Sequence, residues 1–499
     1  MAKLSFKKVL TNIKRLVLRP FKPIKQGVNA LPKIRASQNN KGVLAALRTK
    51  EVQKKIMVTL FIIIIYRILA AVPLPGIDIK LFNEVFGNNP LNNIFTIVTG
   101  GRLDNPSVVA IGLGAYINAS VIIQLLTTVI PKLEELSKEG ERGRRMINSY
   151  TRILAVPLNI IQAFVIYTVM RNVAQTIPEL AGLLDGITTL DIISMIASLT
   201  AGSMLLMWLG ELITEHGIGN GTSVIITISI LSTIPGLLIR DFSFVQSDLN
   251  LLFQNGNFNV LLNPNLTVMY LAIIGLIVLV FGITFITEAS RKITIQYASR
   301  VRAAQAGQSS FLPLKINQAG VMPVIFASAL LTFPQILAQL LTSLSDTESV
   351  LYKIGTAISN SFLAKGYSTG DTQSIFLYEG FFLLLIIFFT YFYTLVTFKP
   401  SETADNLKKS GGFVPGIRPG KETEKYILTV LLRLTFWGAL FLGVVSLVPS
   451  LLRLMPNGSN LSLFSGIGGT SLLIVVGVTI DTIRQIKSVA VTRSYDQFK

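Results

Sequence analysis

Long apolar segments alternate with short polar segments along most of this chain. Crossing about 30 Å of hydrocarbon takes about 20 helical residues. Ten segments meet this requirement, and they predict transmembrane helices near 56–74, 108–131, 152–170, 189–210, 222–239, 267–287, 318–343, 376–398, 426–449 and 467–483. Several are interrupted by Gly, Pro, Ser or Asn, which is typical of helices that pack on one another and line a cavity.

Composition supports a membrane protein. Hydrophobic residues make up 51% of the chain and charged residues only 14%, which is too little charge to cover a soluble protein of this size. The chain has no cysteine, which excludes disulfides, thiolate metal sites and a thiol nucleophile.

The basic residues predict the orientation. Lys and Arg number 45 against 26 Asp and Glu, for a net charge of +19. Most of the basic residues fall in the segments expected on one side of the membrane. The loops of the opposite side hold only Lys80, Arg102, Arg171, Arg240, Lys353, Lys365 and Arg453. Because basic loops stay in the cytoplasm, we expect both termini there.

The pattern divides the chain into a basic cytoplasmic extension and two halves. Residues 1–55 form the extension, and the apolar spacing within 4–17 predicts an amphipathic helix on the membrane surface; a ribosome or nucleic-acid contact is the alternative. Ten spans split into five plus five, and an odd-numbered repeat inverts the second half. Spans one to six are expected over 56–287, with the second half beginning at about 267, and a cytoplasmic loop follows over 288–316. Spans seven to ten are expected over 317–483 with a cytoplasmic loop over 398–425, and a cytoplasmic tail over 484–499 ends the chain.

Catalytic patterns are missing, so we do not expect an enzyme, a cofactor or a metal site. The one histidine, His216, precedes a glycine-rich stretch over 217–221. No strand precedes this stretch, so a flexible break before span five is favoured over a phosphate-binding loop. No carboxylate pair lies at mid-membrane depth, which disfavours an ion-coupled secondary transporter; that class is the alternative function.

Three other segments carry candidate functions. Residues 91–99 are apolar but too short to cross, and Gly100, Gly101 and Pro106 follow. They predict a re-entrant piece shielded by protein, or else an ordinary amphipathic outer loop. The loops over 288–316 and 398–425 combine basic residues with Gly and Pro. In the second loop, Phe413, Val414, Pro415 and Ile417 are expected to be exposed apolar residues beside Arg418, a mixture that suits docking of a large partner.

Several long motifs follow one another along the chain: GAYINASVIIQLLTTVIPKLEELSKEGERGRRMINSYTR, LMWLGELITEHGIGNGTSVII, LPLKINQAGVMPVIFAS, KPSETADNLKKSGGFVPGIRPG and GGTSLLIVVGV. In this order they closely resemble the SecY/Sec61-alpha family of protein-translocation channels. The resemblance runs from about residue 56 to the end of the chain. It implies an all-α polytopic fold of ten helices in two inverted halves around an hourglass pore. It also implies a lateral gate between spans two and three and spans seven and eight.

The resemblance also assigns residues and partners. It implies a pore ring of Ile117, Val121, Thr222, Ile226, Ile325 and Ile474. It implies a plug helix near 92–106 that includes Ile94, Phe95, Ile97, Val98, Gly100 and Gly101. Docking of the ribosome or the SecA ATPase would involve Arg300, Arg302, Lys408, Lys409 and Arg418. Further implied partners are the SecE and SecG subunits, unfolded signal-bearing preproteins and the lipid of a bacterial plasma membrane. From spacing alone, the i,i+4 pairs of the ring favour a lipid-facing stripe, and only the motifs favour the pore ring.

Overall fold

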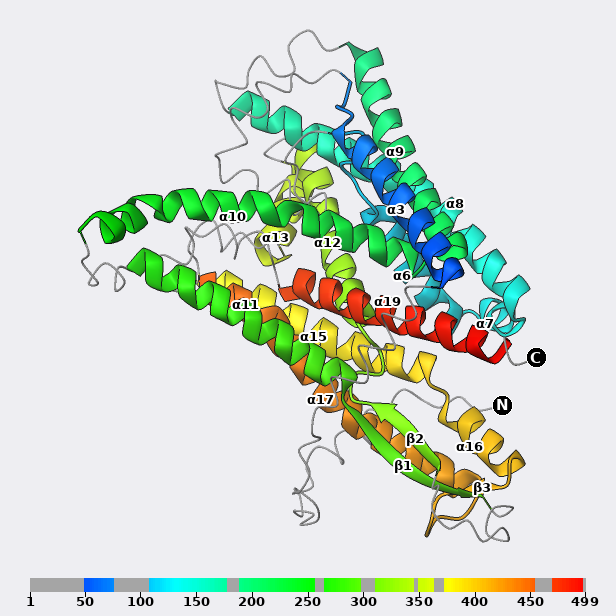
Figure 1. Ribbon diagram of the computed structural model, residues 1–499. Helices are drawn as coiled ribbons and strands as arrows, with labels where there is room; N and C mark the ends of the chain where they lie inside the picture. Colours follow the sequence, from blue (N-terminus) through cyan, green and yellow to red (C-terminus); the bar gives the residue numbers. More distant parts are fainter. Residues whose placement is uncertain are drawn as a thin grey trace.

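A computed structural model describes residues 49–75, 107–176, 188–255, 264–297, 310–344, 349–362, 372–453 and 469–496. The predicted amphipathic helix over 4–17 lies outside the described residues. Figure 1 shows long helices that cross one another, with a small sheet beside α16 (Pro400–Lys409) and the beginning of α17 (Lys421–Arg453).

A helix coincides with each of the ten predicted spans. These helices are α3 (Lys50–Ala71), α6 (Gly114–Val129), α8 (Glu141–Thr176), α9 (Thr189–His216), α10 (Gly221–Asn255), α11 (Pro264–Glu288), α12 (Met322–Leu344), α15 (Thr372–Thr397), α17 (Lys421–Arg453) and α19 (Gly469–Asp496). Shorter helices are α7 (Pro131–Lys138), α13 (Val350–Phe362) and α16 (Pro400–Lys409).

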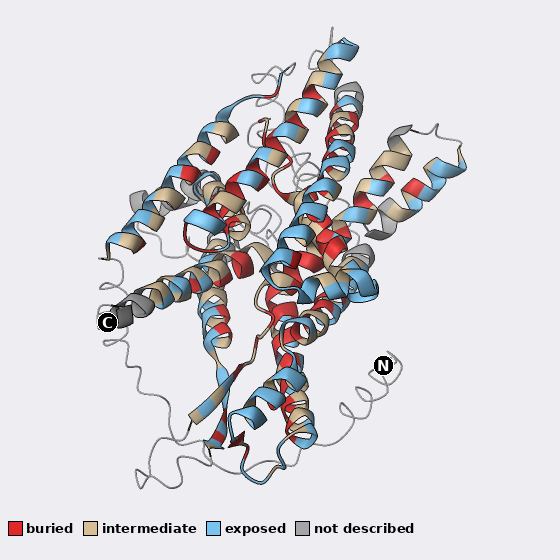
Figure 2. Ribbon diagram, turned by 90° about the vertical axis from the view of Figure 1, so that its right-hand side faces the viewer, coloured by how far each residue is buried: buried red, intermediate tan, exposed pale blue. Residues whose placement is uncertain are grey.

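The helices have the length and surface of a multi-pass membrane protein. Seven helices in the described part of the chain are long and apolar enough to cross a membrane, and α6 with α7, bent by 101°, makes an eighth. This count is consistent with ten crossings. Helix α11 exposes the apolar side chains of Ile274, Ile277, Val278, Phe281 and Phe285, and Figure 2 shows exposed faces along most helices. Such faces are stable when lipid surrounds them.

Local chemistry sets several helix boundaries. The Thr188 and Asp191 side chains each accept a hydrogen bond from the other's backbone N–H, a capping box at the start of α9. Pro131 and Pro400 stand in the first turns of α7 and α16, where a missing N–H costs little. A Cβ on Gly221 would lie 1.8 Å from the carbonyl oxygen of Gly210. Only glycine at 221 therefore lets α9 and α10 approach this closely.

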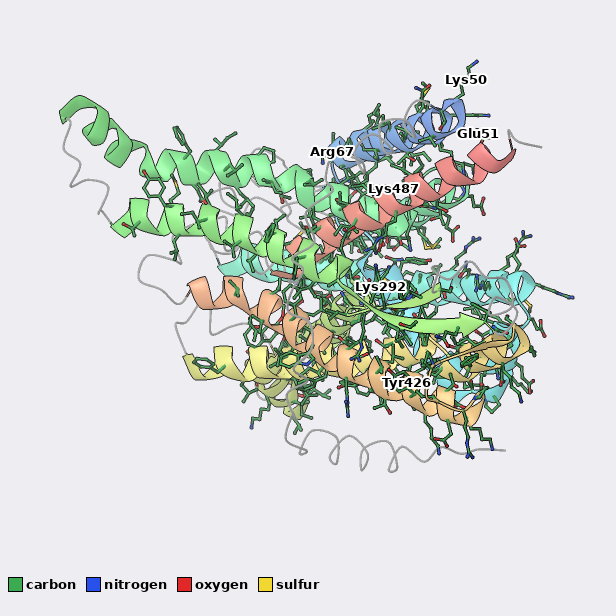
Figure 3. The ribbon with its side chains drawn as sticks, turned by 60° about the horizontal axis from the view of Figure 1, so that its bottom comes forward. Lys50, Glu51, Arg67, Lys292, Tyr426 and Lys487 are labelled. Carbon is green, nitrogen blue, oxygen red and sulfur yellow. The ribbon has the colours of Figure 1, made fainter. Side chains whose placement is uncertain are left out.

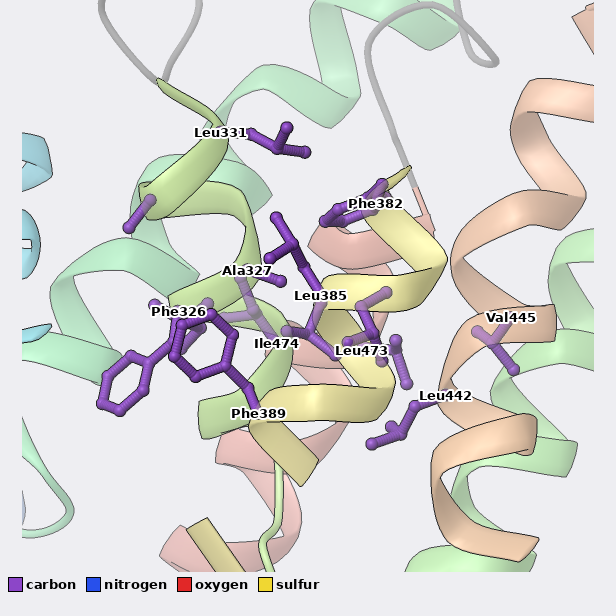
Figure 4. Packing of buried hydrophobic residues seen from close by; sticks show 14 of the residues in the cluster. Phe326, Ala327, Leu331, Phe382, Leu385, Phe389, Leu442, Val445, Leu473 and Ile474 are labelled. Carbon is purple, nitrogen blue, oxygen red and sulfur yellow. The ribbon is translucent and has the colours of Figure 1, made fainter. Parts of the chain in front are cut away.

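Two apolar clusters hold the described helices together. One joins α3, α6, α9 and α10 through residues such as Tyr66, Leu113, Leu206 and Ile225. The other joins α6, α10, α11, α12, α15, α17 and α19. Figure 4 shows side chains of this second cluster from α12, α15, α17 and α19, with Phe326 close to Phe389. The rings of this pair meet edge to face, with centroids 5.9 Å apart.

A three-stranded antiparallel sheet occupies segments that we expected to be loops. Its order is β2 (Ser310–Lys315), β1 (Ser290–Tyr297) and β3 (Gly412–Phe413), and Ile293 pairs with Leu312 while Gln296 pairs with Phe413. The two cytoplasmic loops of the sequence analysis are therefore one structure. The predicted all-α fold class describes the helices but does not include this sheet.

The sheet also corrects one expectation about exposure. Val414 was predicted to be exposed, but it is buried in a cluster with Ile293, Leu314 and Val430. The prediction was wrong because strand pairing folds the segment over an apolar patch, which a search for local charge and turn residues does not detect. Phe413 and Ile417 are half-buried, and Pro415 is exposed as expected.

Candidate functional site

Five of the six predicted ring residues share one apolar cluster. Val121, Ile325 and Ile474 are buried in it, and Ile117 and Ile226 pack against it. These residues come from α6, α10, α12 and α19, which are far apart in the sequence. Figure 4 shows Ile474 among side chains of α12 and α15. Branched apolar groups offer an ion no ligand to replace its hydration shell, so such a cluster resists ion passage.

Thr222, the sixth residue, lies in the first turn of α10, one turn before Ile226. Its hydroxyl donates a hydrogen bond to Asn220 Oδ1 at 2.8 Å. Its methyl carbon lies 3.2 Å from the position that a Cβ on Gly210 would take. The structure therefore places Thr222 at the junction of α9 and α10, with its polar atom satisfied locally.

Helix α12 packs against α6, α8 and α15. The resemblance implies a lateral gate with α6 and α8 on one side and α12 and α15 on the other. Because α12 contacts α6 and α8, the two sides of the implied gate touch in this structure. Buried amides accompany the apolar packing. Asn159 Nδ2 of α8 donates to Ala155 O at 2.9 Å, and Gln162 of the same helix is buried beside Gly114 of α6. Sequence reasoning missed these amides because single polar residues inside an apolar span make no periodic signal.

The predicted plug over 92–106, including Ile94, Phe95, Ile97, Val98, Gly100 and Gly101, lies outside the described residues. The structure does describe the residues that flank it. Pro73 and Ser107 form an antiparallel bridge, and Val108 N–H donates to Val72 O at 3.0 Å. The described residues just before and just after 76–106 therefore lie side by side. The turn that follows packs on α9, where Ser203 Oγ donates to Gly112 O at 2.9 Å.

The predicted docking residues Lys408, Lys409 and Arg418 are exposed. The two lysines end α16, just before β3. Arg418 stands between Gly416 and Gly420, whose φ angles of 79° and 101° require glycine. Its carbonyl oxygen accepts a hydrogen bond from Thr423 Oγ1 at 2.9 Å. The backbone is thus fixed while the guanidinium stays exposed. Arg300 and Arg302 lie outside the described residues.

Charged residues of β2, α11 and α19 lie near enough to act on one another. Burial, and secondly the charge of Arg484, lower the pKa of Lys315, while Asp481 and Glu288 oppose the shift. Arg484 also donates from Nη2 to Thr287 O at 3.2 Å, near the end of α11. This contact joins the last helix to the base of the sheet.

The glycine-rich stretch over 217–221 is held by side chains from three helices. Ile218 N–H donates to Thr59 Oγ1 of α3 at 3.1 Å, and Gly221 N–H donates to Thr214 Oγ1 of α9 at 2.8 Å. Gly219 N–H donates to Gln485 Oε1 of α19. These donors are already used, which disfavours phosphate binding. His216 is exposed, and no group of three or more His, Asp and Glu in the described part of the chain is placed to hold a metal ion.

These observations define the class. The chain is a multi-pass helical membrane protein whose helices meet on an apolar cluster, with a small antiparallel sheet and exposed basic residues near it in the sequence.

Comparisons identify the family. The SecY family model matches residues 107–483. The protein translocase subunit SecY of Mycobacterium tuberculosis is 37% identical over 472 residues, covering 91% of this chain and 98% of the relative. The Streptomyces coelicolor subunit of the same name is 39% identical over 469 residues, with the same coverage of both chains. The chain therefore belongs to the SecY family.

Solved structures show the same fold. A protein-conducting channel superposes with a TM-score of 0.60 at 18% identity, covering 88% of this chain and 93% of that chain. Sec61 from a canine ribosome-channel complex of the endoplasmic reticulum gives a TM-score of 0.57 at 18% identity, with the same coverage. The fold of this chain is that of a SecY/Sec61 channel.

Proposed function

We propose that this chain is a channel subunit through which unfolded, signal-bearing polypeptides cross a bacterial plasma membrane. The observation that carries the proposal is the convergence of Ile117, Val121, Ile226, Ile325 and Ile474 on one apolar cluster. A constriction of branched side chains makes no specific hydrogen bonds, so a passing chain of any sequence slides through. At rest, the same side chains keep ions out.

Lateral release uses the contact between the two halves. When α12 separates from α6 and α8, a path opens from the central cluster to the lipid. Apolar segments of a passing chain, such as signal sequences and membrane helices, then leave through this path because lipid stabilises them. The buried amides Asn159 and Gln162 lie on the α8 side of this contact.

Energy and partners come from outside the chain, which has no catalytic activity of its own in this proposal. The exposed Lys408, Lys409 and Arg418, together with Arg300 and Arg302, form the docking surface for SecA or the ribosome. SecE and SecG complete the complex. Both termini are cytoplasmic, one following the C-terminal helix α19 and the other preceding α3; Figure 3 labels Lys50 in the first turn of α3 and Lys487 in α19. Residues 92–106 close the outer side as a plug.

Planar-bilayer recording tests the constriction. Ile226→Asn and Ile474→Asn each place a hydrogen-bonding amide in the apolar cluster, so we expect water to enter and the resting ion conductance to rise. Deleting residues 94–104 should also produce leakage, at least transiently.

Thr222→Asn is the matched control. Position 222 is already polar and lies one turn away from Ile226 on the same helix, so the rise in conductance should be much smaller. Silent channels for both Ile226→Asn and Ile474→Asn, in protein that still transports a precursor, would show that the cluster is ordinary core packing.

A further inference from the structure

Two hydroxyl groups of α3 form hydrogen bonds with α10 and with the turn just before it. Thr59 Oγ1 accepts a hydrogen bond from Ile218 N–H at 3.1 Å. Further along α10, Ser229 Oγ lies 2.5 Å from the hydroxyl oxygen of Tyr66. Ser229 Oγ already donates its one hydrogen to Ile225 O at 3.0 Å. Tyr66 is therefore the donor in its bond with Ser229.

The two bonds are spaced to fit helices that run side by side in the same direction. Thr59 and Tyr66 are two helical turns apart, which puts both hydroxyls on one face of α3, separated by about 10 Å. On α10, the first residue, Gly221, and Ser229 are separated by about 12 Å. The first turns of α10 therefore lie between two points that α3 holds.

The groups in these bonds are shielded from water. Tyr66 is 7% exposed and Ile218 is 3% exposed. A Cβ on Gly217 would lie 2.5 Å from Thr59 Oγ1, so glycine at 217 lets α3 approach the end of α9 this closely. Because a buried polar group without a partner costs free energy, these bonds fix both the height and the rotation of α10.

The rotation of α10 decides which side chain reaches the ring. Ile225 is buried in the cluster that contains Tyr66. Its neighbour Ile226 also packs against the other cluster, the one that contains Ile474. Successive residues of a helix point about 100° apart. A turn of α10 about its axis would therefore move Ile226 away from Ile474.

We propose that Tyr66 and Thr59 are positioning residues for the constriction. They hold α10 at the height and rotation at which Ile226 closes the channel, so the inference rests on the proposed function of the ring. Helix α3 is described over all its 22 residues, and none of them belongs to the cluster that holds the ring residues. Helix α3 thus acts on the seal through α10.

Resting ion conductance of the full chain in planar bilayers tests the Tyr66 bond. Tyr66→Phe removes only the phenolic oxygen, and Ser229→Ala removes the acceptor. We expect each to raise the conductance about three- to tenfold, the change that loss of one hydrogen bond makes in a two-state equilibrium. The double variant should leak no more than either single variant, because both remove the same bond. Ser229→Thr keeps the hydroxyl and should keep the parental conductance.

The second bond has its own variants and a matched control. Thr59→Val removes the acceptor of Ile218 N–H and should also leak, whereas Thr59→Ser keeps the hydroxyl and should stay tight. Thr227→Val is the control. It removes a buried hydroxyl whose hydrogen bond, to Ser223 O at 2.8 Å, stays within α10, so the conductance should not change.

The same recordings separate this inference from the proposed function. If Tyr66→Phe and Ser229→Ala are silent while Ile226→Asn conducts, the constriction stands and the positioning role is wrong. A lower Tm in detergent without a rise in conductance would show that the bond serves folding alone. If Ile226→Asn and Ile474→Asn are silent as well, the proposed function fails and this inference fails with it.

Discussion

Arg152 of α8 and Glu211 of α9 form a two-pronged ion pair. Arg152 Nε donates to Glu211 Oε1 at 2.8 Å, and Arg152 Nη2 lies 2.7 Å from Glu211 Oε2. The side chains are 45% and 20% exposed, so water screens the pair only in part. Because α8 also packs on α6 and α12, the pair ties the α8 side of the implied gate to α9.

Breaking this pair should loosen the junction of α8 and α9. We expect Glu211→Gln and Arg152→Ala each to destabilise the protein by about 1 kcal/mol, seen as a lower apparent Tm of the purified chain in detergent. Arg152→Lys should recover little, because an ammonium cannot reproduce the planar fork. Glu141→Gln is the matched control: it removes the Arg145 partner in an exposed pair within one helix, and it should barely change the Tm.

The positive charge of Lys315, which is half-buried in β2, should affect stability in a pH-dependent way. Burial lowers the pKa of Lys315 below 10.5, and repulsion from Arg484 lowers it further. The positive charge of Lys315 therefore reduces the free energy of unfolding. This reduction is fully present at pH 7 and fades as the pH rises toward 10.5. Lys315→Met should therefore raise the Tm at pH 7 by about 1–2 °C, a small rise because the ammonium is partly solvated.

The pH dependence separates this cause from a general gain in apolar packing. The difference in Tm between Lys315→Met and the parent chain should shrink near pH 10. A constant difference across pH would show that charge is not the cause. Lys292→Met, at an exposed position of β1, should leave the Tm unchanged at every pH.

Arg418 should act in partner-driven transport and not in folding. Its carbonyl oxygen is fixed by Thr423 and its side chain is exposed, so Arg418→Glu should leave expression and the resting seal intact. Loss of a charge-assisted, two-pronged contact should weaken partner binding about tenfold or more. Arg418→Lys should fall between. Normal precursor transport by Arg418→Glu into proteoliposomes would move the docking site to residues 291–302.

Cysteine labelling tests the orientation. A thiol reagent that cannot cross membranes should modify Ser243→Cys, in α10, when added outside intact cells. It should modify Ser410→Cys only after the membrane is opened. The reverse pattern would show that the distribution of basic residues misassigned the two sides.

The sequence by itself determined where the long helices lie. Each predicted span coincides with a helix because about 20 apolar residues in lipid must satisfy their backbone groups internally. The break between two helices over 217–221 also follows from local chemistry. The long motifs, matched in order, were enough to indicate the family.

Only the tertiary structure decided which apolar faces meet. Spacing could not tell whether Ile117 and Val121 face lipid or other helices, because both environments are apolar and favour the same side chains. The structure puts them in one cluster with Ile325 and Ile474. The pairing of Gln296 with Phe413 and the contact of Gly355 with Leu341 are likewise long-range or close-packing relationships. They depend on how the fold brings separate segments of the chain together. The local spacing of apolar residues carries no information about such contacts.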